Sequence, residues 1–189
     1  MAGYFPPMRA RVAVVGFVMS ADGSQLLSLY HNANASDPSY GMHNGISGDL
    51  RSRESVAEAM FRVVEEETGR RPSNMQLRGV VHWSGFGPER ESVLGHIFRI
   101  HGLEGGVDGI PKFVDRGQLK WVDVGSLLNG DLPMFDGDRK ILPEVLRPDP
   151  RPFFGYMPYE NGRPSNWICE TFPRYAVRKS RSGSSGEGK

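Results

Sequence analysis

The sequence predicts one domain of the mixed α/β (α+β) class, and three patterns support that prediction. Residues 11–19 read RVAVVGFVM, a continuous apolar run with β-branched residues that is typical of a buried strand. Residues 54–69 carry apolar side chains at helical spacing, and further strand-like runs follow them. A chain of 189 residues with 38% hydrophobic content is long enough for one well-buried domain and short for two.

Composition narrows the classes of partner. The formal net charge of +1 argues against a broad electrostatic surface for nucleic acid or membrane, so neither partner is expected. No apolar run reaches 18 residues and the first ten residues lack an apolar signal core, which favours a soluble cytoplasmic protein. Cys169 is the only cysteine, which excludes an internal disulfide; it is interpreted as a buried thiol. No pattern indicates the oligomeric state.

The first elements form a predicted hairpin. After the strand at 11–19, residues 21–24 (ADGS) are a turn signal, and residues 25–30 are the expected returning strand. Residues 31–40 read as a polar loop, and His31 is interpreted as a surface residue of that loop.

The helix that follows is the best-defined element. It opens at Glu54-Ser55, and one apolar stripe runs along it, formed by Val56, Met60, Val63 and Val64. Gly69 suits the left-handed position just past a helix end.

Two acids in the last turn of this helix need an explanation. The helix dipole disfavours negative charge there, so Glu66 and Glu67 are expected to have a cationic partner, and a divalent metal is the first candidate. A solvated acidic turn explains the same spacing equally well.

The rest of the chain predicts strands, a helix and a hairpin. Pro143 is expected to interrupt or restart the predicted helix at 139–146. The segments are strands at 75–83, 92–101 and 118–123, a helix at 139–146, a hairpin over 151–167 with its turn at 160–162, and a final strand or tail over 168–177. Residues 1–178 are therefore assigned to a single domain, and the Gly/Ser-rich residues 179–189 to a disordered tail.

The stretch from Gly48 to Gly69 resembles the Nudix box. That pattern is Gly, five residues, Glu, seven residues, then Arg-Glu-aliphatic-any-Glu-Glu-any-Gly-aliphatic. Seven positions fall in register: Gly48, Glu54, Arg62, Val64, Glu66, Glu67 and Gly69. The resemblance implies the Nudix fold, a mixed β-sheet sandwiched between helices. It also implies hydrolysis of nucleoside diphosphates linked to another group, with Mg²⁺ as cofactor and Mn²⁺ as the alternative.

The resemblance also assigns roles. Glu66 and Glu67 are expected to be catalytic and to ligate the metal, because Mg²⁺ prefers carboxylate oxygen, with the Gly48 carbonyl as a further ligand. Arg62 is assigned to the catalytic set, and its expected ion pair with Glu54 supports the loop against the helix.

Three positions depart from the family pattern. Val63 stands where the family has Glu, Arg70 where it has an aliphatic residue, and Asp49 where the branch described next usually has Lys. Losing a general base costs roughly 10²–10⁴-fold in rate, so a slow enzyme is expected. Glu89 and Glu91, in the predicted loop at 84–91, are candidates to replace the missing carboxylate.

Residues 43–50 resemble the segment before the box in the oxidised-purine triphosphatase branch of the family. In that branch the residue matching Asn44 reads the purine, an aromatic matching Phe135 stacks on it, and an acid matching Asp138 hydrogen-bonds its edge. The alternatives are a simple turn at Asn44, a core Phe135, and Asp138 as N-cap of the helix at 139–146.

These patterns predict a Nudix pyrophosphatase that cleaves a purine nucleoside triphosphate, such as an oxidised one, to monophosphate and pyrophosphate. One alternative is an enzyme acting on a nucleotide sugar, a dinucleoside polyphosphate or a biosynthetic intermediate. Another is a catalytically degenerate domain that binds a nucleotide.

Overall fold

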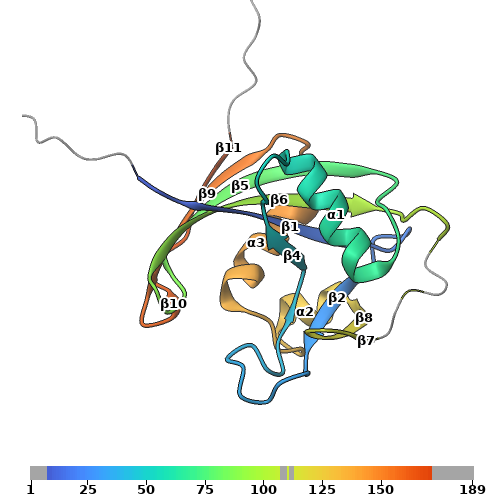
Figure 1. The fold of residues 1–189 in the computed structure, drawn as a ribbon, viewed down its shortest axis with the longest axis horizontal. Coiled ribbons are helices and arrows are strands. Elements are labelled where there is room, and N and C mark those ends of the chain that lie inside the picture. Colours follow the sequence, from blue (N-terminus) through green and yellow to red (C-terminus); the bar gives the residue numbers. More distant parts are fainter. Residues whose placement is uncertain (1–7, 107–109, 111–112, 172–189) are drawn as a thin grey trace, which may run out of the picture.

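One mixed sheet forms the middle of the molecule (Figure 1). The computed structural model describes residues 8–106, 110 and 113–171; the predicted tail at 179–189 and the end of the segment 168–177 lie outside the described residues. Within them the sheet has eleven strands, in the order β10-β9-β5-β6-β1-β2-β8-β7, with β11 beside β9, β3 beside β2 and β4 beside β1. No helix among the described residues is long and apolar enough to cross a membrane.

The elements have the following bounds. The strands are β1 Arg11–Met19, β2 Gln25–His31, β3 His43–Asn44, β4 Ile46–Asp49, β5 Met75–Phe86, β6 Glu91–His101, β7 Phe113–Val114, β8 Gly117–Asp123, β9 Phe153–Glu160, β10 Arg163–Pro164 and β11 Ile168–Thr171. The helices are α1 Val56–Thr68, α2 Val124–Asn129 and α3 Asp136–Leu146.

Strand β1 lies at the centre and changes partners along its length. It runs parallel to β6 from end to end. On its other side it pairs with β4 up to Gly16 and with β2 from Val18 onward, both antiparallel. This change of partner places the short β4 next to α1, and it positions the candidate site.

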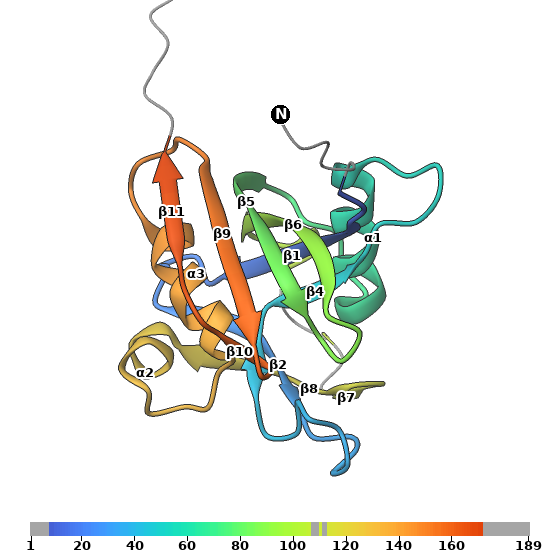
Figure 2. The ribbon, with the colours of Figure 1, turned by 90° about the vertical axis from the view of Figure 1, so that its left-hand side faces the viewer.

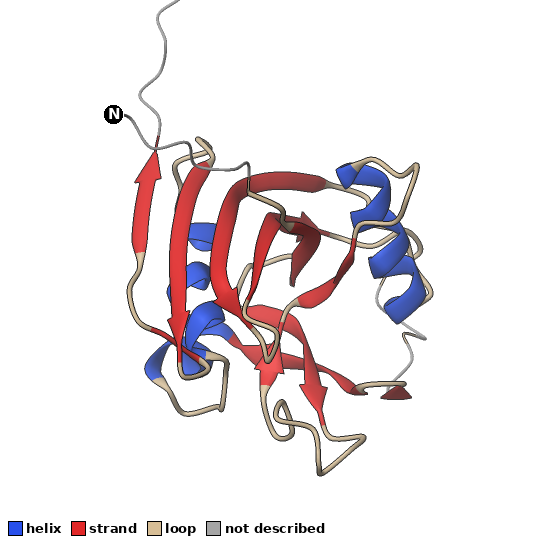
Figure 3. Cartoon of the chain, turned by 60° about the vertical axis from the view of Figure 1, so that its left-hand side comes forward, coloured by secondary structure: helices blue, strands red, loops and turns tan. Residues whose placement is uncertain are grey.

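Helices lie on both faces of the sheet, with α1 on one face and α2 and α3 on the other (Figures 2 and 3). An apolar layer lies between the sheet and the helices on each face. Successive residues of a strand point to opposite faces, so Val15 and Phe17 pack towards α2 and α3, while Val14 and Val18 pack towards α1. The expected sandwich of a mixed sheet between helices is therefore confirmed.

Helix α1 has the predicted ends. Ser55 is the N-cap, and its side chain and that of Glu58 form a capping box. Gly69 ends the helix with φ 68°, and its N–H donates to the Glu65 carbonyl.

Three boundaries differ from the prediction. Strands β5 and β6 extend towards each other, so the predicted loop at 84–91 shrinks to a turn at 87–90. Helix α3 starts at Asp136 with Phe135 as N-cap, so the alternative reading of Asp138 as N-cap is wrong. Pro143 lies inside α3 without interrupting it.

The closing hairpin forms as predicted. Asn161 and Gly162 both have positive φ, 52° and 76°, as a two-residue turn of type I′ requires. Strand β11 then pairs with β9, and burial raises the pKa of the half-buried Cys169 thiol to about 11.

Candidate active site

Helix α1 and strand β4 approach each other closely at Val63. A Cβ added to Gly48 would lie 2.6 Å from the Val63 Cγ2, so the close approach requires glycine at position 48. Val63 is 3% exposed and belongs to the apolar layer under α1. The family's Glu position is thus filled here by a core side chain.

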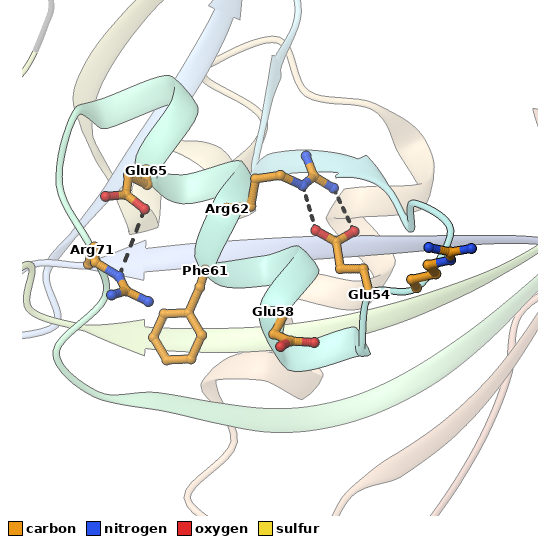
Figure 4. A pocket seen from close by; sticks show the side chains of 7 residues that line it. Glu54, Glu58, Phe61, Arg62, Glu65 and Arg71 are labelled. Carbon is orange, nitrogen blue, oxygen red and sulfur yellow. Dashed lines mark hydrogen bonds and ion pairs between the residues drawn. The ribbon is translucent and has the colours of Figure 1, made fainter.

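Arg62 ties the loop before α1 to the helix. Its Nε lies 2.6 Å from Glu54 Oε1, and its Nη2 donates both to Glu54 Oε2 at 3.0 Å and to the Asp49 carbonyl at 2.9 Å. Figure 4 shows Arg62 and Glu54 facing each other across the start of the helix. Arg62 and the Arg51 N–H hold the pKa of Glu54 down at about 2. The predicted ion pair is formed.

Both acids of the last turn face arginines. Glu66 is bound by Arg62 Nη1 at 2.9 Å and by Arg51 Nη1 at 3.0 Å. Glu67 Oε1 lies 2.5 Å from Arg116 Nη2, and the same nitrogen donates to the Ser47 carbonyl at 3.1 Å. The expected cationic partners exist in this structure, and they are guanidinium groups.

The oxygen donors at this point suit a hard divalent cation. Arg116 Nη2 occupies a position where a carboxylate and a backbone carbonyl converge, and the second carboxylate, Glu66, adjoins Glu67 on α1. Mg²⁺ is commonly held by one or two carboxylates while it keeps several waters. No group of three or more His, Cys, Asp or Glu with metal-binding geometry occurs in the described part of the chain, so the fit is to a site of two carboxylates. The carbonyl that points here is that of Ser47. The predicted ligand, the Gly48 carbonyl, points the opposite way, because Gly48 pairs with Val14 and its backbone groups face β1.

The other charged residues near the box are also paired. Arg11 binds the Asp49 carboxylate, so the reversed charge at position 49 has a counter-ion. The same arginine binds Glu91 at 3.1 Å, which brings this candidate base to the start of the box. Glu65 pairs with Arg71 at 3.8 Å (Figure 4).

A second cluster forms where β3 meets the segment before α3. The His43 N–H donates to the Pro133 carbonyl, and His43 forms a parallel bridge with Met134. This contact brings Asn44 next to the start of α3, where Asp138 accepts the Gly45 N–H. The three predicted base-reading residues, Asn44, Phe135 and Asp138, therefore lie in one region.

Asp138 titrates in the neutral range. Burial raises its pKa to about 7, although the hydrogen bond from Gly45 opposes the shift. The group therefore donates a hydrogen bond when protonated and accepts one when ionised, and both forms are populated near pH 7. Burial and the nearby Asp138 also raise the pKa of Tyr159, which stays protonated.

His31 belongs to this cluster, and the interpretation as a surface loop residue is wrong. It ends β2, is half-buried, and its Nε2 lies 3.2 Å from Asn44 Oδ1. Its ring also meets Phe135 edge to face, with centroids 6.2 Å apart. No local sequence signal identifies this role, because it arises from the pairing of β2 with β3.

Comparisons with known proteins identify the domain family and the fold. A model of the NUDIX domain matches residues 9–145. The MutT protein of Bacillus halodurans is similar in structure, with 23% identity and a TM-score of 0.70, over 86% of this chain and 99% of that chain. MutT from Methanosarcina mazei Go1 shares 18% identity with a TM-score of 0.56, over 75% of this chain and 96% of that one.

A third similar structure is the NUDIX domain of Shewanella oneidensis NrtR, solved in complex with ADP ribose. It shares 14% identity with a TM-score of 0.59, over 76% of this chain and 92% of that one. At these identities the structural likeness shows a shared fold.

Proposed function

The chain belongs to the Nudix family, and from this premise we propose that it is a metal-dependent nucleotide pyrophosphohydrolase. Its substrate in this proposal is a purine nucleoside triphosphate, such as an oxidised one. Water adds to a phosphorus atom, one P–O–P bridge breaks, and the products are a nucleoside monophosphate and pyrophosphate.

The observation that carries the proposal is the segment 43–49, which joins the two clusters. Its first half, Asn44 and Gly45, contacts the region of Phe135 and Asp138. Its second half, Ser47 to Asp49, contacts the charged side chains of α1 and Arg116. One extended ligand can therefore place a base at one cluster and its phosphates at the other.

Each residue of the acidic cluster has a role in the proposal. Glu66 and Glu67 are the carboxylate ligands of Mg²⁺ or Mn²⁺, and the Ser47 carbonyl, which points to the same place as the Glu67 carboxylate, is the further ligand instead of that of Gly48. When bound, that cation neutralises phosphate charge and lowers the pKa of water. Arg62 keeps Glu66 and the loop at 49–54 in place through its bonds to both.

At the other cluster, Asn44 and Asp138 read the base edge and Phe135 offers a face for stacking. An amide carries both a donor and an acceptor, and Asp138 has both roles near neutral pH. These groups suit a purine edge, where donors and acceptors alternate.

The rate is expected to be low. Val63 leaves no carboxylate at the family position of the base, and such a loss costs roughly 10²–10⁴-fold. Glu91, held near Asp49 by Arg11, is the candidate to accept the proton from water.

Two alternatives remain, and each is supported by an observation. The similar NrtR domain was solved with ADP ribose, which favours another nucleoside diphosphate-linked substrate. The burial of Val63 and the arginines on Glu66 and Glu67 favour a domain that binds a nucleotide without cleaving it.

Turnover of a substrate panel tests these proposals. The panel contains normal and oxidised nucleoside triphosphates, ADP ribose, nucleotide sugars and dinucleoside polyphosphates, each with Mg²⁺ and with Mn²⁺. Metal-dependent release of pyrophosphate from one purine triphosphate supports the leading proposal, and preference for a linked diphosphate supports the first alternative.

Two variants serve as controls for this assay. Glu67→Gln should abolish turnover, whereas Glu65→Gln, which changes an exposed acid on the same helix, should leave it unchanged. No turnover across the panel, together with a nucleotide-induced rise in Tm, would show a binding domain.

A further inference from the structure

Four side chains form a hydrogen-bonded line that ends at the base cluster. The Ser39 Oγ lies 2.5 Å from Asp37 Oδ1 and 3.2 Å from His31 Nδ1. On the other side of the ring, His31 Nε2 lies 3.2 Å from Asn44 Oδ1. The line therefore runs from a surface carboxylate, through a hydroxyl and an imidazole, to the amide that the proposed function assigns to the base.

The protons in this line can be counted. The hydroxyl of Ser39 has one hydrogen, and hydrogen bonds from the Ser39 side chain and backbone keep the pKa of Asp37 below its usual range. The ionised carboxylate only accepts, so the hydroxyl hydrogen lies in the short bond to Asp37. Ser39 Oγ must then accept from the ring, which puts a proton on His31 Nδ1.

The proton on Nδ1 leaves two self-consistent arrangements. In a neutral ring Nε2 has no hydrogen, so Asn44 must turn its NH₂ group to His31 and its carbonyl away from it. In a doubly protonated ring Nε2 donates to the Asn44 carbonyl, and the NH₂ group faces outward. The two ends of an amide look alike in shape, so the hydrogen-bond network decides its orientation.

We propose that His31 is a positioning residue that sets which end of the Asn44 amide faces the base of a bound nucleotide. The inference rests on the proposed function, because it needs Asn44 to read a base. It assigns base selectivity to a residue outside the box. It also gives a role to the loop 34–39, which is connected to Asn44 through the His31 ring.

Neutral pH favours the neutral ring and the arrangement with the carbonyl outward, which is the reverse of the orientation in the structure, where Asn44 Oδ1 faces the ring. Burial lowers the pKa of His31, and the nearby Arg116 lowers it further, although the bond to Asn44 raises it. The charged or titratable groups around the ring come from four parts of the chain: Asp37, Asp115 and Arg116, Glu67, and His43. The outward carbonyl favours a base edge that donates, such as an amino group.

A pair of substitutions with opposite hydrogen-bonding character tests the inference. His31→Glu offers only acceptors when ionised, so Asn44 keeps its NH₂ towards position 31. His31→Lys offers only donors, so the amide turns over. The readout is the ratio of dissociation constants for adenosine and inosine monophosphates, which differ in having an amino group or an oxygen at the purine 6-position. Because both ligands carry the same phosphate, effects of the added charge cancel in the ratio.

The expected result is that wild-type and His31→Glu favour the amino-bearing base and that His31→Lys shifts the ratio by about tenfold towards the oxygen-bearing one. Ser39→Ala should reduce the preference, because either ring nitrogen can then carry the proton. Ser36→Ala, in the same loop, is the matched control and should leave the ratio unchanged.

A second measurement does not depend on nucleotide binding. Nitrogen-15 NMR of the free protein reports which nitrogen of His31 carries the proton, and a neutral ring protonated on Nδ1 is expected. A neutral ring protonated on Nε2 would overturn the inference, as would equal base ratios in wild-type, His31→Glu and His31→Lys. If folded wild-type protein binds no nucleotide at all, the proposed function and the base-reading role fall together.

Discussion

At the scale of single residues, we expect Val63 to limit how strongly the acidic cluster can hold a cation. The valine packs against Gly48 in the apolar layer, so position 63 adds no carboxylate to the two acids nearby. Val63→Glu places a carboxylate at a site that is 3% exposed. Without metal this should lower the free energy of unfolding by about 3 kcal/mol, because a buried charge lacks a partner.

With Mg²⁺ the same variant should recover stability, and its rise in Tm on adding Mg²⁺ should exceed that of the wild-type. Val63→Ala is the matched control: it should lose about 2 kcal/mol through the cavity it leaves and gain no metal response. Thermal unfolding with and without Mg²⁺ measures both. Equal metal responses in Val63→Glu and wild-type would show that position 63 does not limit metal binding.

Asp138 should make stability depend on pH. Its pKa in the folded protein is about 7, raised from 3.8, so the folded state holds this proton more tightly than the unfolded chain. Its contribution to stability is complete below pH 3.8 and is lost as the pH rises towards 7. Asp138→Asn removes the charge and keeps an oxygen that can accept the Gly45 N–H.

The stability advantage of Asp138→Asn over wild-type should therefore grow between pH 5 and pH 8, by on the order of 2 kcal/mol. Urea unfolding at several pH values without nucleotide measures it. Asp136→Asn, exposed in the same helical turn, controls for losing an acid at the helix start. A difference that stays constant with pH would contradict the buried-acid interpretation.

At the scale of elements, the charged bridge between the loop and α1 should keep the site ordered. Glu54 accepts the Arg51 N–H at 2.8 Å and is paired with Arg62, which also holds the Asp49 carbonyl. Glu54→Gln weakens this set, so the amide of Arg51 should exchange with solvent about tenfold faster or more. Amides in the middle of α1 should be unaffected.

Hydrogen exchange followed by NMR gives this readout for each amide. Glu65→Gln is the control, because its partner Arg71 lies 3.8 Å away and both side chains are more than half exposed. If both variants exchange alike at Arg51, the bridge does not order the loop.

The end of α3 depends on a buried arginine. Arg78 is 1% exposed, and its Nη2 donates to the carbonyls of Glu144, Arg147 and Asp149. Arg78→Met removes these donors and leaves buried carbonyls unpaired, so it should cost about 3 kcal/mol of unfolding free energy by denaturant titration. Since α3 carries Asp138, weaker nucleotide binding should accompany the loss. If Arg78→Met is as stable as the wild-type protein, water must hydrogen-bond to these three carbonyls in place of the arginine.

Elements with a strong local pattern were predictable from the sequence, and short elements were not. Strand β1 has a continuous apolar run, and α1 has both caps and an apolar stripe, so local physics defines them. Strand β4 is only four residues long and contains Ser, Gly and Asp, which are poor strand formers; it exists because β1 offers it an edge. The start of α3 was missed because Phe135 provides no side-chain cap.

The same division holds for the candidate site. The box residues lie close together along the chain, so the resemblance to the family pattern was enough to predict the ion pair of Glu54 and Arg62. The partners of the acids could not be predicted, because Arg116 reaches Glu67 only through the sheet, from a position 49 residues away. The role of His31 likewise depends on strand pairing.

At the scale of the whole molecule, the fold separates the proposed base-reading cluster from the acidic cluster and joins them by one segment. Residues 43–45 meet α3 on one side, and residues 47–49 meet α1 on the other. Because β1 pairs with β4 and β2 with β3, the central sheet sets the spacing between the two clusters. A nucleotide with a short phosphate chain should then use the first cluster alone.

This arrangement predicts that dependence on metal grows with the number of phosphates. In the proposed binding mode, a monophosphate at Asn44 and Phe135 is expected not to reach Glu66 and Glu67, so Mg²⁺ should change its dissociation constant little. A triphosphate brings its negative charge against those carboxylates and should bind about tenfold or more tightly with Mg²⁺ than without. Calorimetric titration of the mono-, di- and triphosphate of one base measures the trend.

The variant Glu67→Gln separates the two clusters in the same experiment. It should reduce the effect of Mg²⁺ on triphosphate binding and leave monophosphate binding unchanged, because Glu67 lies at the phosphate end with Arg116 and Ser47. If Mg²⁺ instead tightens all three ligands equally, the base cluster and the acidic cluster are not occupied by opposite ends of one nucleotide. The joining segment 43–49 would then be a structural link only, and the phosphates would have to bind elsewhere on the sheet.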